Sequence, residues 1–445
     1  MDLRNQLVAV CGMQMSGLAA VKLLRAHGAL VRAVDQKPTP EIEAQLRDLG
    51  VPLAAQNEAA FADVDRIVLS PGVPADLEVF AAARSRGVPV IGDVELAGYL
   101  LEGPVIGITG SNGKTTTTSL AGHMLREAQI DCQVGGNIGF APCAMVETSA
   151  PDRWNVLELS SFQLETIEQF RVHVSVGLNV TDNHIDRHKT FANYVAAKRR
   201  LFETQEPSGH AILNADNAIC VSYAEATRAQ VHWFSSKRTL ERGAWLSGDT
   251  ILLDGTPLAD ASSIRLRGRH NLENVMAAAL AAHLAGAPLD RIAAAAATFQ
   301  AVEHRLEFVA AIDGVDYFND SKATSVDAAL KALDAFPGRL WVILGGHHKG
   351  SDYTVMRKPL HDKARMALLI GEASPILAEQ LRGAVPLLAC ETLDAAVAAA
   401  RRQAQPGDTV LLAPACSSFD QFTSYEHRGR VFKSLVKAAA NGGGN

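Results

Sequence analysis

The chain has 445 residues, 48% of them hydrophobic and 20% charged, and a formal net charge of −6. This length predicts about two to three globular domains, and the acidic balance gives no reason to expect binding to nucleic acid or an anionic membrane. No apolar run reaches the ~20 residues of a membrane span, and we expect no signal peptide. The six cysteines are scattered singly, which is typical of a reduced cytoplasmic protein.

Along the chain, a short β-rich run, a glycine turn and an Ala/Leu-rich amphipathic stretch recur in this order. The alternation predicts parallel sheets covered by helices, that is, an α/β fold. The turn residues differ between three stretches of the chain, which predicts three α/β units. A Gly-Pro linker before residue 105 and a second break near residue 301 predict domains at residues 1–98, 99–301 and 302–445.

The first unit opens with the segment LVAVCGMQMSG (7–17), a helix expected to reach His27, and a strand, Leu30–Val34, before Asp35. A glycine turn with an acid about twenty residues on is typical of dinucleotide-binding βαβ units. Gln14 replaces the middle glycine of the strict fingerprint, so a turn without a ligand is the alternative. The segment RIVLSPGVP (66–74) predicts a strand that enters a loop at the ligand-binding edge of the sheet.

The second unit begins with the strand Val105–Thr109 and the loop GSNGKTTTT (110–118). The general phosphate-loop pattern requires a glycine where this chain has Ile108. A glycine loop between a strand and a helix nevertheless turns backbone N–H groups toward phosphate oxygens. Lys114 would then reach the β and γ phosphates and Thr115 would bind Mg²⁺. The alternative is a glycine turn that binds nothing.

Acidic and imidazole side chains follow two further strands of this unit. Glu158 ends a buried-looking strand, where a carboxylate is costly unless a cation accompanies it. His184 and His188 lie in the segment DNHIDRH (182–188), and each alone is as well explained by a structural hydrogen bond. Because Glu158 and Thr115 are expected at neighbouring strand ends, we favour His184 as a Mg²⁺ ligand. A zinc site for hydrolysis is the weaker interpretation, because no cysteine pair accompanies the histidine.

Lys198 lies in a predicted helix, within the segment YVAAKRRLF (194–202). It is followed by Arg199 and Arg200. From the residues alone, the expected interpretation is a solvated lysine on an exposed helix face.

Motifs along nearly the whole chain, in order and at regular spacing, resemble those of the Mur ligases, the cytoplasmic ligases that build the peptidoglycan stem peptide. The ATP loop is shared by the superfamily, including folylpolyglutamate synthase, whereas SSFQLE and NDSKAT resemble the branch that adds D-glutamate. The motifs are TGSNGKTTTT (109–118), ELSSFQLE (158–165), NVTDNHIDRH (179–188), GRHNLENV (268–275), EHRLE (303–307), NDSKATS (319–325), GGHHKGSD (345–352) and PACSSFDQF (414–422).

This resemblance implies a Rossmann-like N-terminal domain, a central P-loop ATPase domain with a mostly parallel sheet, and a Rossmann-like C-terminal domain that closes to deliver the amino acid. It implies an ATP-dependent enzyme that adds D-glutamate to UDP-N-acetylmuramoyl-L-alanine through an acyl phosphate, with two Mg²⁺ ions. ATP is the co-substrate, and ADP and phosphate are products. We expect a cytoplasmic monomer with small-molecule substrates and no nucleic-acid or membrane partner.

Motif matches to this family also imply the site residues. The uridine diphosphate substrate would be bound by Met15, Ser16, Gly17, Asp35, Ser70, Gly72 and Asn137. ATP would be bound by Gly110, Ser111, Asn112, Gly113, Lys114, Thr115, Thr116, Asn274, Arg305, Asp320 and Lys322. The metal ligands would be Thr115, Glu158, His184 and Lys198, the last as a carbamate. The catalytic residues would be Lys114, Asn137, His184 and Lys198. D-Glutamate would be bound by Thr324, Lys349, Ser418 and Tyr425.

Two positions depart from the family pattern. Asn183 stands where an aspartate is common, so a charged role there is in doubt, and Tyr425 stands where phenylalanine is often found. Two alternatives to D-glutamate addition stay open. A sister ligase would share the ATP loop but should lack the SSFQL and NDSKAT pair. A non-catalytic nucleotide-binding module would bind ATP without amino-acid-dependent phosphate release.

Overall fold

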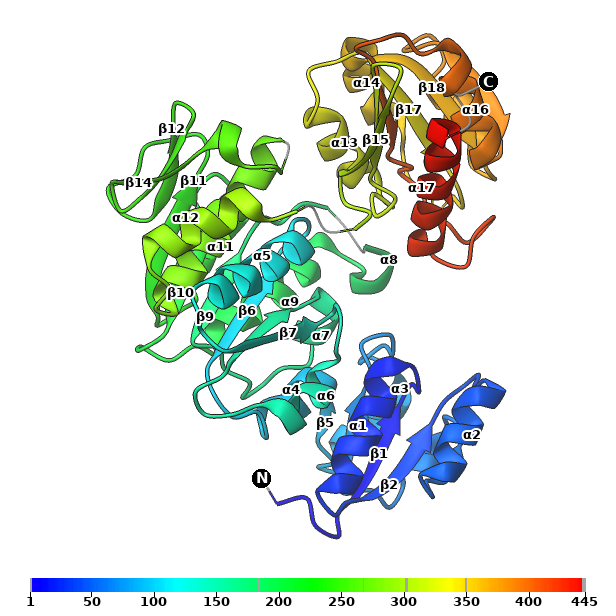
Figure 1. The fold of residues 1–445 in the computed structure, drawn as a ribbon. Helices are drawn as coiled ribbons and strands as arrows, with labels where there is room; N and C mark the ends of the chain where they lie inside the picture. Colours follow the sequence, from blue (N-terminus) through cyan, green and yellow to red (C-terminus); the bar gives the residue numbers. More distant parts are fainter. Residues whose placement is uncertain (1, 183–184, 267, 301–302, 349, 442–445) are drawn as a thin grey trace. The chain divides into compact units, whose positions relative to one another are not determined.

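The computed structural model describes residues 2–182, 185–266, 268–300, 303–348 and 350–441, which form two compact units. The first contains Met1–Ser263 and Glu273–Thr298, and the second contains Ile264–Leu272 and Phe299–Asn445. Three β-sheets follow one another along the chain, two in the first unit and one in the second (Figure 1). Within the described ranges, no helix is long and apolar enough to cross a membrane.

The N-terminal sheet has the strand order β3-β2-β1-β4-β5, and all its strand pairs are parallel. Val8 and Val10 of β1 pack into one core cluster while Ala9 and Cys11 pack into another, so both faces are buried. The strand order reverses between β1 and β4, the position at which open α/β sheets bind ligands. The elements are β1 (Leu7–Cys11), α1 (Met15–Ala26), β2 (Leu30–Val34), α2 (Pro40–Asp48), β3 (Leu53–Ala54), β4 (Arg66–Leu69), α3 (Glu78–Ser85), β5 (Val90–Gly92) and α4 (Asp93–Gly98).

The central sheet has the order β14-β13-β12-β11-β10-β9-β6-β8-β7. It is parallel from β7 to β12, and an antiparallel meander, β12-β13-β14, forms one edge. Its strands are β6 (Val105–Thr109), β7 (Cys132–Gly136), β8 (Trp154–Glu158), β9 (Val174–Gly177), β10 (His210–Asn214), β11 (Gln230–Ser235), β12 (Ala244–Ser247), β13 (Thr250–Leu253) and β14 (Thr256–Asp260). The helices are α5 (Lys114–Glu127), α6 (Pro142–Met145), α7 (Ser161–Leu164), α8 (Ile185–His188), α9 (Phe191–Glu203), α10 (Ala218–Ser222), α11 (Arg269–Leu284) and α12 (Leu289–Thr298).

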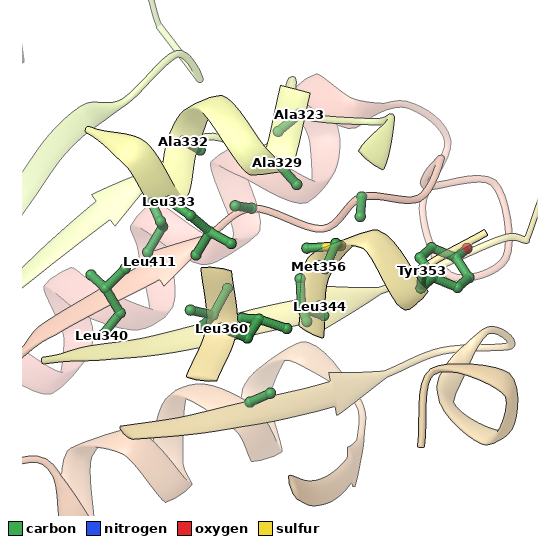
Figure 2. Packing of buried hydrophobic residues seen from close by; sticks show 14 of the residues in the cluster. Ala323, Ala329, Ala332, Leu333, Leu340, Leu344, Tyr353, Met356, Leu360 and Leu411 are labelled. Atoms are coloured by element: carbon green, nitrogen blue, oxygen red, sulfur yellow. The ribbon is translucent and has the colours of Figure 1, made fainter. Parts of the chain in front are cut away.

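The sheet of the second unit has the order β15-β16-β20-β17-β18-β19, with only the β15–β16 pair antiparallel. In one of its core clusters, Ala329 and Leu333 of α13 pack with Leu340 and Leu344 of β17 (Figure 2). The elements are β15 (Glu307–Ile312), β16 (Val315–Asn319), α13 (Val326–Asp334), β17 (Leu340–Gly345), α14 (Arg357–Lys363), β18 (Ala364–Ile370), α15 (Ser374–Gln380), β19 (Leu387–Glu391), α16 (Leu393–Gln403), β20 (Thr409–Leu412) and α17 (Tyr425–Asn441).

The predicted α/β fold with mostly parallel sheets is confirmed. The parallel sheets place the loops that carry most of the predicted site residues at the carboxyl ends of their strands. The domain boundaries at residues 98/99 and 301/302 stay predictions.

Candidate active site

The predicted phosphate loop lies between β6 and α5 and is held by the segment that follows β9. Asn179 accepts a hydrogen bond from the Asn112 amide at 3.0 Å, and its side chain donates to the Asn112 carbonyl at 3.1 Å. The Ser111 amide donates to the Asn179 carbonyl at 2.7 Å. These contacts fix the loop backbone before any ligand binds, which is the preorganisation that phosphate binding requires.

Gly113 has φ +85° and is followed directly by α5. A Cβ atom there would collide with Oδ1 of Asn274, so both the conformation and the close approach require glycine. Asn274, one of the predicted ATP-binding residues, therefore lies beside the phosphate loop. Thr115 and Thr116 are buried in the first turn of α5, where backbone N–H groups favour anions.

The amine of Lys114 is folded onto the loop that precedes it. It donates to the carbonyls of Gly110 at 2.9 Å and Ser111 at 3.0 Å. This placement keeps a positive charge at the loop, as the prediction of a phosphate-binding lysine requires.

Lys198 of α9 contacts the same loop, and the interpretation of a solvated lysine is wrong. Its side chain is only 1% exposed, its amine donates to the Gly110 carbonyl at 2.8 Å, and it lies 4.7 Å from the ring centre of Tyr194. Burial, reinforced by the nearby charge of Lys114, holds the pKa of Lys198 well below its usual range. A neutral lysine amine is nucleophilic, so this residue is chemically able to take up CO₂ and become an anionic carbamate.

Glu158 ends β8, the strand paired with β6, and is 2% exposed. Its Oε1 accepts a hydrogen bond from the Asn137 side chain at 2.9 Å, whereas its Oε2 has no partner within the described part of the chain. A buried carboxylate oxygen without a donor is costly unless a cation satisfies it. The carboxylate and the Thr115 hydroxyl are oxygen donors of the type that Mg²⁺ prefers, so these residues fit the predicted metal.

Of the two histidines of the DNHIDRH segment, the structure describes only His188. His184 lies outside the described residues. His188 is buried and its Nε2 is 2.9 Å from the hydroxyl of Ser161, with its ring edge-on to Tyr194. These contacts favour the interpretation that His188 has a structural, hydrogen-bonding role.

One group of three potential metal ligands occurs among the described residues, and it lies in the second unit. It consists of Glu303, His304 and Glu307. The amine of Lys433 donates to both carboxylates, at 2.8 and 2.6 Å, and so already provides the positive charge that a metal ion would otherwise provide. This group gives no support to a zinc hydrolase.

The predicted uridine diphosphate residues of the N-terminal sheet also lie together. Gly17 approaches the Gly12 carbonyl so closely that a Cβ would collide with it, and the Ser70 hydroxyl donates to the same carbonyl at 2.7 Å. Asp35 accepts from the Met13 amide at 2.7 Å and so braces the turn. Met15, the first residue of α1, is 66% exposed, and the carbonyl of Gly72 accepts from Arg187 at 3.4 Å.

Sequence reasoning missed Asp93, the first residue of α4, which is buried beneath this turn. Its Oδ1 accepts from the Val94 amide at 2.9 Å, and it interacts with the side chains of Ser16 and Gln163. Burial raises the pKa of Asp93 to about 6. The local sequence carries no signal of this, because burial arises from packing between segments far apart in the chain.

We expect Asp93→Asn to stabilise the protein more at pH 8 than at pH 5. The folded-state pKa is raised, so stability is greatest when Asp93 is protonated and declines as the pH rises through about 6. The neutral variant avoids this loss. The difference in free energy of unfolding between variant and parent should therefore increase in favour of the variant by about 1 kcal/mol from pH 5 to pH 8. Urea unfolding at both pH values measures it. Asp290→Asn, at a side chain that is 80% exposed, is the control, and an equal advantage at both pH values would contradict the expectation.

Residues predicted to complete the nucleotide site gather in the second unit around the end of β16. Asp320 is buried, its amide donates to the Leu412 carbonyl at 2.9 Å, and its Oδ1 has no partner among the residues that the structure describes. Burial raises the pKa of Asp320 to about 6, although the charges of Arg305 and Lys322 act in the opposite direction. The Lys322 amine lies 5.6 Å from the ring centre of Tyr425.

Two of the predicted D-glutamate residues follow neighbouring strands of the same sheet. Thr324 lies in the loop after β16 and its amide donates to the Lys322 carbonyl at 2.8 Å. Ser418 is buried in the loop after β20. The amide of Ala415 donates to the Ala323 carbonyl at 2.9 Å, which joins the two loops. Lys349 lies outside the described residues.

Three family models match the chain in order: the Mur ligase MurD-like N-terminal domain at residues 6–92, the Mur ligase middle domain at 108–282, and the Mur ligase glutamate ligase domain at 304–416. The chain therefore belongs to the Mur ligase family, and the predictions of three Mur ligase domains and of an ATP-dependent amide-forming ligase are confirmed.

Among curated relatives, UDP-N-acetylmuramoylalanine–D-glutamate ligase of Solibacter usitatus (strain Ellin6076) is 59% identical over 436 residues, with 98% of each chain covered. The protein of the same name from Acidobacterium capsulatum is 47% identical over 449 residues, covering 98% of this chain and 97% of the relative.

Two solved structures have the same fold at low identity. A pseudomurein peptide ligase type C from Methanothermus fervidus superimposes with a TM-score of 0.61 at 18% identity, over 98% of this chain and 100% of the other. UDP-N-acetylmuramate-alanine ligase from Thermotoga maritima gives 0.60 at 16% identity, over 98% and 99%.

Proposed function

We propose that this chain adds D-glutamate to UDP-N-acetylmuramoyl-L-alanine at the expense of ATP, forming an amide, ADP and phosphate. The observation that carries the proposal is the convergence of Lys114 and Lys198 on the carbonyl of Gly110, beside a buried carboxylate with an unsatisfied oxygen. The relatives that are 59% and 47% identical over nearly their whole length carry the name of this reaction.

The chemistry follows from the low electrophilicity of a carboxylate. The alanyl carboxylate of the substrate would attack the γ-phosphoryl group of ATP and become an acyl phosphate, which an amine can attack. The phosphate loop orients the nucleotide through its backbone amides, and Lys114 stabilises the charge that develops on the transferred group. The amine of D-glutamate then displaces phosphate and forms the amide. Acyl phosphates hydrolyse in water, which explains why a closing domain would deliver the amino acid.

Mg²⁺ would be held by Thr115, Glu158, His184 and the Lys198 carbamate, where it would neutralise phosphate charge and polarise the transferred phosphoryl group. Two ions are proposed because a carbamate presents two oxygens. Asn137 orients the Glu158 carboxylate through its 2.9 Å hydrogen bond. The low pKa of Lys198 supports the presence of the neutral amine that carbamate formation needs.

The two anionic substrates would bind to loops of different sheets. The uridine diphosphate end would lie at the Gly12–Gly17 turn, where α1 begins at Met15 and presents its first N–H groups. The D-glutamate carboxylates would be bound by Thr324, Lys349, Ser418 and Tyr425 through charge-assisted hydrogen bonds. Arg305, Asp320 and Lys322 would complete the nucleotide site.

We further propose that the enzyme acts in the cytoplasm as a monomer. Its six cysteines are all free, as a reducing compartment favours. Size-exclusion chromatography with light scattering would test the monomer.

A panel of amino acids tests the substrate assignment. Phosphate release with UDP-N-acetylmuramoyl-L-alanine and ATP should rise with D-glutamate and stay at background with L-glutamate, L-lysine or meso-diaminopimelate. Stimulation by one of the latter and not by D-glutamate would identify a sister ligase. ATP binding without release under any amino acid would identify a nucleotide-binding module.

A further inference from the structure

Three loops of the second unit meet at the carboxyl ends of the adjacent strands β16, β20 and β17. They are residues 319–324, 413–418 and 345–348. Backbone hydrogen bonds join the middle loop to both others: the Ala415 amide donates to the Ala323 carbonyl at 2.9 Å, and the His347 amide donates to the Ser417 carbonyl at 2.9 Å. The proposed nucleotide and D-glutamate residues of this unit therefore depend on how these loops are held together.

The side chain of Arg428, from α17, lies between these loops and is 0% exposed. Its Nε donates to the Ser321 hydroxyl at 3.0 Å and its Nη2 to the Ser321 carbonyl at 2.9 Å. The same guanidinium donates to the Cys416 carbonyl at 3.2 Å and the Ser417 carbonyl at 3.3 Å. One side chain thus bridges the loop after β16 and the loop after β20.

The third loop closes against the same group. Gly346 has φ +136°, and a Cβ atom there would collide with the Ser417 carbonyl and lie 3.1 Å from Nη1 of Arg428. Glycine is required because the backbone passes directly beside the guanidinium. The Ser321 hydroxyl that accepts from Arg428 also donates to the Tyr425 carbonyl at 2.8 Å, which anchors the start of α17.

Within the described residues, the Arg428 guanidinium donates to carbonyl and hydroxyl oxygens and to no carboxylate, and the nearby charge of Asp420 also favours its charged form. Burial lowers the pKa of Arg428 to about 10, so the group stays charged at neutral pH. A buried charge held in this way is costly, and only the planar fork of arginine has enough donors for these acceptors. Lysine would keep the charge but leave carbonyls without donors.

We propose that Arg428 is a positioning residue for the amino-acid step, which holds the loop of Ser417 and Ser418 in register with the loop of Asp320 to Lys322. This inference rests on the proposed D-glutamate site at Ser418. The guanidinium acts through the loops it bridges, and D-glutamate affinity depends on it. Binding of the uridine diphosphate substrate, assigned to the first unit, does not.

Steady-state kinetics of Arg428→Ala and Arg428→Lys would test the proposal, with Arg430→Ala, at an exposed arginine of the same helix, as the matched control. In Arg428→Ala the KM for D-glutamate should rise about 10- to 100-fold, because loop carbonyls lose their donors. The dissociation constant of the uridine diphosphate substrate should stay within about twofold of the parent value. Guanidinium at low millimolar concentration should lower the raised KM in Arg428→Ala and leave Arg430→Ala unaffected.

Arg428→Lys keeps the positive charge but removes the guanidinium fork, and it decides the question if the alanine variant does not fold. A raised D-glutamate KM at an unchanged melting temperature would support the positioning role. A parental KM in Arg428→Lys would overturn it. A loss shared equally by both substrates, without guanidinium rescue, would also overturn it, because that is the behaviour of a purely structural residue.

Ser418→Ala separates this inference from the proposed function on which it rests. If Ser418→Ala raises the D-glutamate KM and neither Arg428 variant does, the positioning role fails and the amino-acid site stands. If Ser418→Ala leaves that KM unchanged, the assignment of the D-glutamate site fails.

Discussion

Lys114→Ala is expected to lower D-glutamate-dependent phosphate release by about 1,000-fold, because the charge that stabilises the transferred phosphoryl group is lost. The Lys114 amine donates to the carbonyls of Gly110 and Ser111 and so lies within the loop. Most of the loss should fall on kcat, since the interaction strengthens in the transition state. Coupled ADP and phosphate assays at saturating substrates measure it.

Lys22→Ala, at an exposed lysine of α1, is the control and should keep parental activity. Retention of D-glutamate-dependent ADP release by Lys114→Ala would mean that the loop is not the ATP site.

Lys198→Ala is expected to lose about 100- to 1,000-fold in activity and to regain part of it when short carboxylic acids such as acetate are added. The amine that would carry the carbamate is buried under the phosphate loop, 2.8 Å from the Gly110 carbonyl. A small carboxylate that enters the vacated space would supply the two oxygens that the carbamate would have presented. Activity is measured against acetate concentration, with bicarbonate removed.

The neighbouring Arg199→Ala is the control for this rescue, because Arg199 is half exposed in an ion pair with Glu203 on the same helix. It should be active and insensitive to acetate. If Lys198→Ala keeps parental activity in bicarbonate-free buffer, with no response to acetate, the carbamate is excluded.

The features predicted well from the sequence are local ones. The β6 strand and the loop from Gly110 to Thr116 are encoded in consecutive residues, and Gly113 is required by its own φ and by its contact with Asn274. The turn at Gly12 and the positions of Asp35 and Ser70 are also predictable from the local sequence, because each lies at the end of a recognisable strand.

The residues misjudged or missed owe their environment to distant contacts. Lys198 looked solvated because two arginines follow it, yet it contacts a loop 88 residues away. Arg428 lies in a charged helical segment and bonds to Ser321, 107 residues away. Asp93 is buried by neighbours that no local pattern identifies. The roles of His184 and Lys349 remain predictions.

The proposed reaction requires that a carboxylate, and not water, attacks the γ-phosphoryl group of ATP. UDP-N-acetylmuramoyl-L-alanine that carries ¹⁸O in its alanyl carboxylate distinguishes the two in turnover with ATP and D-glutamate. Mass spectrometry of the released phosphate should detect an ¹⁸O atom derived from the carboxylate, because an acyl phosphate keeps that oxygen on phosphorus when the amine displaces it. Phosphate without the label would contradict the account, since it would have been formed by attack of water on ATP.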